Sequence, residues 1–164
     1  MNLTQFNQMS AADAQHCIEH CVALPDWAAA LVDARPYASL AALLAQAESL
    51  TQTWEGIALT QALSAHPRIG ERAGGSGKEA ALSRREQGQV NAEDLPLAQA
   101  LQVGNAAYEQ RFGQVFLIRA KGRSGEQILT ELQRRLQNDA QQEQREALQQ
   151  LREITLLRLE ETFR

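Results

Sequence analysis

His66 is one of three histidines in the chain, and it stands between a helical pattern and Pro67. The residue before a proline is disfavoured in helical dihedral angles, so the pattern predicts that a helix ends at His66. The helix dipole favours a protonated imidazole at a C-terminus, where histidine can give or take a proton near neutral pH. The position indicates a general acid or base, and equally a C-capping histidine without chemistry.

Ser83, Glu86 and Gln87 follow at spacings i, i+3 and i+4, which place them on one face of a predicted helix. A hydroxyl, a carboxylate and an amide on one face can recognise a polar ligand that carries both donors and acceptors. The same Ser-x-x-Glu pattern is also a capping box, which needs no ligand. The sequence leaves both interpretations open.

Arg158 falls inside the apolar stripe of the last predicted helix, between Leu151 and Ile154 on the helical wheel. An arginine that faces apolar neighbours is costly unless it meets an anion or hydrogen-bond acceptors. We therefore consider a bound anion, a salt bridge within the protein, and a side chain that extends past the core edge to water. The arginine pairs at 84–85 and 134–135 are expected on solvated helix faces.

A cluster of two histidines and two cysteines lies near the N-terminus: His16, Cys17, His20 and Cys21. All four occupy two turns of one predicted helix, which cannot easily surround a metal ion. We therefore expect no metal, and we expect the cysteines to be reduced and packed in the core. The glycine-rich loop 70–77 lacks the spacing of a phosphate-binding loop, and we expect it to be a lid beside His66.

The elements that position these residues are predicted to be helical almost throughout, because helix-forming residues dominate and β-branched residues are sparse. The sequence predicts one all-α domain, 1–164, of about eight helices. The expected helices cover Ser10 to Cys21, Pro25 to about Leu31 before Pro36, Ser39 to Trp54, 55–66, 78–90, 94–112, 124–138 and 139 almost to the C-terminus. Gly113 is an expected helix stop, and 115–118 is an extended apolar run expected as a buried connection.

The composition is that of a globular protein, with 44% hydrophobic and 22% charged residues. The formal net charge of −4 argues against nucleic acid or an anionic membrane as a partner. No apolar run reaches the ~18 residues needed to span a bilayer. The N-terminus lacks the pattern of a signal peptide, so we expect a cytoplasmic protein.

Six motifs occur in one order along the chain: HPRIG, LSRREQ, NAAYEQRFGQVFLI, KGRS, ILTELQRRLQN and EITLLRL. Together they resemble the 2-oxo-4-hydroxy-4-carboxy-5-ureidoimidazoline (OHCU) decarboxylase family, from about Phe6 to Leu159. The resemblance implies an all-helical, usually homodimeric enzyme without cofactor or metal. Its implied reaction removes carbon dioxide from OHCU and yields (S)-allantoin in urate degradation.

The resemblance also implies a substrate site. Its residues would be His66 and Glu86 as catalytic groups, with Pro67, Ser83, Gln87, Phe116, Leu117, Ile118 and Arg158 as substrate contacts. Arg68 and Ile69 differ from the Asp-Leu that some family members carry, which leaves the role of this loop open. Two other functions stay under consideration: a helical adaptor that binds a partner without catalysis, and a related enzyme that acts on a different ureido-ring substrate.

Overall fold

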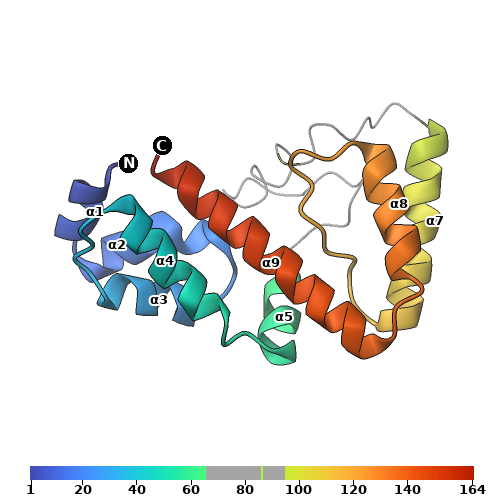
Figure 1. Ribbon diagram of the computed structural model, residues 1–164, viewed down its shortest axis with the longest axis horizontal. Coiled ribbons are helices and arrows are strands. Elements are labelled where there is room, and N and C mark those ends of the chain that lie inside the picture. The colour runs from blue at the N-terminus through green and yellow to red at the C-terminus, as the bar shows by residue number, and fades with distance from the viewer. Residues whose placement is uncertain (66–85, 87–94) are drawn as a thin grey trace. The chain divides into compact units, whose positions relative to one another are not determined.

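The computed structural model describes residues 1–65, 86 and 95–164, which are mainly helical (Figure 1). The prediction of an all-α chain with about eight helices is confirmed, because these residues form eight α-helices and one 3₁₀ turn, and no strand. The elements are α1 Leu3–Gln8, α2 Ala11–Ile18, the 3₁₀ turn η1 Glu19–Cys21, α3 Pro25–Asp33, α4 Leu40–Thr51, α5 Gly56–Leu63, α7 Leu95–Phe112, α8 Gly125–Arg135 and α9 Ala140–Thr162.

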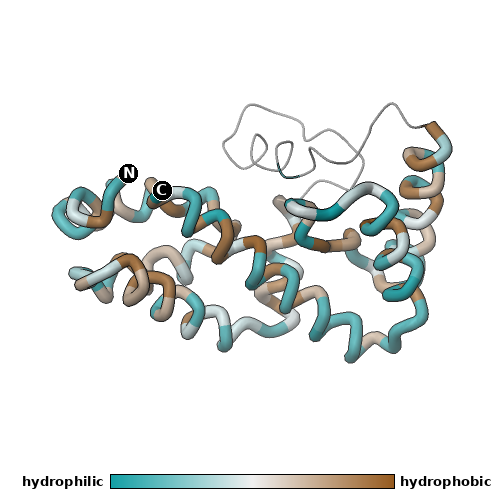
Figure 2. Tube along the Cα trace, turned by 45° about the horizontal axis from the view of Figure 1, so that its top comes forward, coloured by the Kyte–Doolittle hydropathy of each residue, from teal (hydrophilic) through white to brown (hydrophobic). Residues whose placement is uncertain are grey.

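The chain divides into two compact units. The first unit contains 1–62 and 152–164, and the second contains 63–151. Helix α9 contributes its last part to the first unit and its earlier part to the second. In both units apolar and polar positions alternate along the helices, as amphipathic packing requires (Figure 2).

Local signals set most helix boundaries in the first unit. Ser10 and Ser39 cap α2 and α4 as predicted, since each Oγ accepts a backbone N–H of the first turn at 3.1 Å. Pro25 is the first residue of α3, also as predicted. Three expected ends are wrong. Helix α2 stops at Ile18 and tightens into the 3₁₀ turn, α4 ends at Thr51 instead of at Trp54, and α5 ends at Leu63 instead of at His66.

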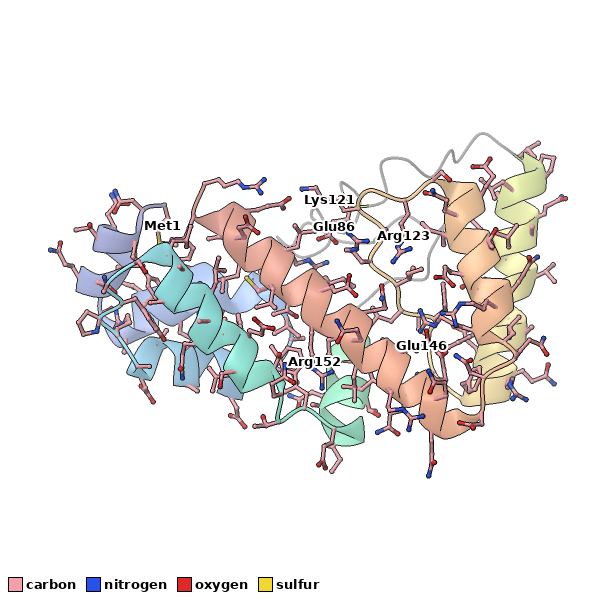
Figure 3. All side chains as sticks on the ribbon, in the orientation of Figure 1. Met1, Glu86, Lys121, Arg123, Glu146 and Arg152 are labelled. Carbon is pink, nitrogen blue, oxygen red and sulfur yellow. The ribbon has the colours of Figure 1, made fainter. Side chains whose placement is uncertain are left out.

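The core of the first unit is built from residues on every helix. Phe6, Ile18, Leu31 and Leu43 are fully buried, and each such side chain stabilises the fold by about 1.5–3 kcal/mol. Arg152 joins α9 to this unit, because its Nε donates to the Thr51 carbonyl at 3.1 Å (Figure 3).

The second unit is organised by close packing of α7 against α8. A Cβ on Gly104 would lie 2.6 Å from Leu132 Cδ2, which is closer than two carbon atoms can pack. A larger residue at position 104 would therefore force the Leu132 side chain to move. Helix α7 ends as predicted, since Gly113 follows it with a φ of 70°. Ser124 caps α8 through a capping box with Gln127. The prediction that 115–118 is a buried connection is confirmed for Phe116 to Ile118.

Across the described ranges, no helix combines the length and the apolar character that crossing a membrane requires.

Candidate active site

The predicted site residues fall into three groups. His66, Pro67, Ser83 and Gln87 lie outside the described residues, so their arrangement stays a prediction. Glu86 is helical and half-buried and belongs to the second unit. The run 116–118 also belongs to the second unit, whereas Arg158 belongs to the first.

Arg158 is buried in the first unit, as its place in the apolar stripe predicts. Only 1% of the residue is exposed, and Nη1 donates to the Cys21 carbonyl at 3.4 Å. The alternative in which this side chain extends past the core edge to water is therefore wrong. A guanidinium buried in this way requires acceptors around it.

The run 116–118 presents buried backbone groups. Phe116, Leu117 and Ile118 are 2–3% exposed and lie outside any helix. The Leu117 carbonyl accepts a hydrogen bond from Arg135 Nη1 at 2.7 Å. In the part of the chain that the structure describes, no other hydrogen bond involves the backbone of these three residues. Because buried N–H and C=O groups are normally paired, those of Phe116 and Ile118 are suited to a polar ligand.

A buried network holds this run in place. Arg135 and Glu143 are 2% and 1% exposed, and the guanidinium Nη2 lies 2.5 Å from Glu143 Oε2. Arg135 Nε lies 3.0 Å from Oε1 of the same carboxylate, and its Cζ lies 4.5 Å from the centroid of the Phe116 ring. The Tyr108 hydroxyl also donates to Glu143, and Asn138 Nδ2 donates to it at 3.2 Å.

Arg135 does not have the environment that its sequence position predicts. The expectation of a solvated arginine pair holds for Arg134, whose side chain is 52% exposed, and fails for Arg135. Successive helical residues point about 100° apart, so two adjacent arginines do not share a face. Arg135 follows Leu132 and Ile128 at the i−3 and i−7 positions of one apolar stripe, and this register was the available signal.

The surroundings of the buried pair Arg135–Glu143 and of the exposed pair Arg134–Glu146 have different electrostatics. Burial raises the pKa of Tyr108 well above its ordinary value, and its hydrogen bond to the Glu143 carboxylate raises it further. Tyr108 therefore stays protonated and donates. On the solvent side, the hydrogen bond from Arg134 lowers the pKa of Glu146 to about 2 (Figure 3).

The residues of the N-terminal histidine and cysteine cluster have separate environments. His16 is exposed and pairs with Glu19 at 2.8 Å, whereas His20 is buried and lies 3.0 Å from the Thr162 hydroxyl. Cys17 and Cys21 form no disulfide. Among the described residues, no three side chains of the metal-ligating types gather where they could hold one ion.

Known proteins are similar to this chain along nearly its whole length. A family model described as OHCU decarboxylase matches residues 7–160. A 2-oxo-4-hydroxy-4-carboxy-5-ureidoimidazoline decarboxylase from Amia calva is 30% identical over 167 residues, which cover 98% of this chain and 94% of the relative. A uric acid degradation bifunctional protein from Bacillus sp. (strain TB-90) is 28% identical over 100% of this chain, which spans only 32% of that relative.

Two solved structures are also similar. A crystal structure of OHCU decarboxylase in the presence of (S)-allantoin has a TM-score of 0.74 and 25% identity, with 88% of this chain and 95% of that chain covered. A crystal structure of (S)-allantoin synthase has a TM-score of 0.73 at 16% identity, covers 99% of this chain and 54% of that one, and supports the fold alone. Since the family model spans almost all of the sequence, this chain belongs to the OHCU decarboxylase family.

Proposed function

We propose that this chain decarboxylates OHCU to (S)-allantoin in urate degradation. The observation that carries the proposal is the family match over residues 7–160. The geometry adds support, because the buried backbone of Phe116 and Ile118 offers donors and acceptors to a polar ring. A ureido-substituted imidazoline carries N–H and C=O groups that complement them.

The proposed chemistry needs little from the protein beyond position and one proton. The C–CO₂ bond breaks, carbon dioxide leaves, and its electron pair moves into the adjacent C=N group of the substrate. The substrate is thus its own electron sink, and the protein must hold the breaking bond in line with that group. One proton must then reach one face of the planar intermediate, and His66 is the proposed group that transfers it.

The other predicted residues take supporting roles in this proposal. Glu86 orients the His66 imidazole or accepts ureido N–H bonds, and Arg158 holds substrate oxygens as the carboxylate departs. Pro67 fixes the chain direction at the histidine. Water must be excluded for a single enantiomer to form, and loop 70–77 is the proposed lid.

Ser83 and Gln87 are proposed to form hydrogen bonds with the remaining polar groups of the substrate, through a hydroxyl and an amide.

We also propose that the protein is a cytoplasmic homodimer. Light scattering after gel filtration would test the dimer. The adaptor alternative stays a prediction: among the described residues the exposed large apolar side chains are Ile57, Leu95 and Val103, and exposed apolar residues are common on protein surfaces.

The decisive experiment generates OHCU from urate in the cuvette with the two upstream enzyme activities. Circular dichroism then follows the appearance of (S)-allantoin. We expect a single enantiomer of allantoin, formed faster than the racemic allantoin that arises from spontaneous decay of OHCU.

The variant H66A should keep the far-UV circular dichroism spectrum of the wild type and lose most of the turnover. A rate within tenfold of wild type would remove His66 from the mechanism. A racemic product at the spontaneous rate with wild-type protein would contradict the proposed function.

A further inference from the structure

We propose that Arg135, Glu143 and Gln150 are positioning residues that aim the backbone of Ile118 at the substrate. This inference rests on the proposed function, because it assigns a cause to the substrate contact expected at 116–118. All of these residues belong to the second unit of the chain. The geometry that supports the proposal consists of two peptide planes, one on each side of the Ile118 Cα.

The first plane is fixed through the Leu117 carbonyl. Arg135 Nη1 donates to this oxygen at 2.7 Å, and the donor is buried. The Leu117–Ile118 peptide bond is trans. In a planar trans peptide the C=O and the following N–H point in opposite directions. The Ile118 N–H is therefore directed away from Arg135.

The second plane is fixed through the next N–H. Arg119 donates its backbone N–H to Gln150 Oε1 at 2.9 Å. By the same planarity, the Ile118 carbonyl is directed away from Gln150. One residue thus presents a donor and an acceptor whose directions are each set by an anchor on the neighbouring helices α8 and α9.

The first anchor is itself held rigidly. The Arg135 guanidinium donates through Nε and Nη2 to the Glu143 carboxylate. Rotating the guanidinium toward another acceptor would therefore break two charged hydrogen bonds. Glu143 is held in turn by the Tyr108 hydroxyl and by Asn138. Buried ion pairs are often replaceable by apolar residues without loss of stability. A role in directing one peptide plane explains why this core holds charges.

The arrangement fits one class of chemical group. A neighbouring N–H and C=O on a cyclic amide or urea pairs with the C=O and N–H of a single residue, as in an antiparallel sheet. Both OHCU and allantoin carry such an amide edge. The inferred ligand group at Ile118 is therefore an amide edge of the ring or of the ureido arm.

The test separates the anchors from the general stability of the fold. Q150L removes the acceptor for the Arg119 N–H, whereas Q150E keeps it, and the exposed neighbour Gln149 supplies the control Q149L. We expect Q150L to raise KM for OHCU at least fivefold with kcat within threefold of wild type. Q150E and Q149L should stay within twofold in both constants. R135K retains a positive charge for Glu143 but loses the guanidinium that donates to Glu143 and to the Leu117 carbonyl at once. This variant should also raise KM, and the control R134M should not.

A second measurement does not depend on turnover. In a ¹⁵N-labelled sample titrated with (S)-allantoin, we expect the Ile118 amide signal to shift in wild type and to shift less in Q150L. If wild type lacks OHCU turnover but its Ile118 signal shifts more than that of Q150L, the positioning role is supported and the proposed function is removed. Wild-type turnover with an unchanged KM in folded Q150L and R135K would overturn the positioning role alone. Absence of any Ile118 shift on saturation would also overturn it.

Discussion

Two ion pairs between α8 and α9 differ mainly in their burial, which makes them a test of how the second unit is stabilised. Arg135–Glu143 and Arg134–Glu146 have the same N–O distance of 2.5 Å. Their side chains are 2% and 1% exposed in the first pair, and 52% and 23% exposed in the second. We predict that breaking the buried pair destabilises the fold several times more than breaking the exposed pair.

The expected magnitudes follow from what each substitution leaves behind. R135M leaves the Glu143 carboxylate in the core without its cation, which costs about 3–5 kcal/mol of unfolding free energy. E143L leaves Arg135 buried and also removes the acceptor of the Tyr108 hydroxyl, so its cost is of the same order. The double variant holds neither charge, and it should be more stable than the sum of the single effects by about 2 kcal/mol or more. For R134M and E146L the coupling should be about 0.2–1 kcal/mol.

Urea unfolding monitored by far-UV circular dichroism would measure both double-mutant cycles. In 1 M NaCl the coupling of the exposed pair should fall further, whereas that of the buried pair should persist. The reasoning from burial would be refuted by equal couplings in the two cycles. It would also be refuted by single variants of the buried pair that each cost less than 1 kcal/mol, as surface changes do.

Three further predictions concern pH and capping. The pKa of Glu146 is lowered from 4.5 to about 2 by the Arg134 hydrogen bond, so its stabilisation is present above pH 4.5 and is lost between pH 4.5 and 2. E146Q should accordingly flatten the acid limb of a plot of Tm against pH. Burial raises the pKa of Tyr37 from 10 to about 12, so stability should fall as the pH rises through this interval, and less so in Y37F. S124A removes the acceptor for the Gln127 N–H, and urea unfolding should show a loss of about 1 kcal/mol in the free energy of unfolding. S124D keeps an acceptor at this position and should not show this loss.

The parts of the fold that depend on local chemistry could be predicted from the sequence. Ser10, Ser39 and Ser124 cap helices because a short hydroxyl side chain satisfies a first-turn N–H wherever it precedes an amphipathic segment. Gly113 ends α7 because a positive φ costs glycine little. These interactions involve residues within a few positions of one another, so the linear sequence contains them.

Features that depend on distant residues were missed or misplaced. Cys21 enters the core where α2 tightens into the 3₁₀ turn. The short helix α1 is a local exception, since it begins at Leu3 and its capping box between Asn2 and Gln5 was not predicted. The expected substrate run at 116–118 is placed by residues on α8 and α9, and no motif within the run indicates this dependence. The convergence of His66 with Glu86 and Arg158 remains a prediction, because His66 lies outside the described residues.

One sequence rule emerges from the two inward arginines. Arg135 and Arg158 both occupy apolar registers, and both donate to backbone carbonyls in the structure. For Arg135 the sequence also supplies an inward carboxylate, since Glu143 shares the stripe of Ala147 and Leu151 at i+4 and i+8 of α9. An inward arginine followed by an inward carboxylate on the next helix thus indicates a buried pair within the protein. By this rule Arg135 belongs to the scaffold that directs the run 116–118.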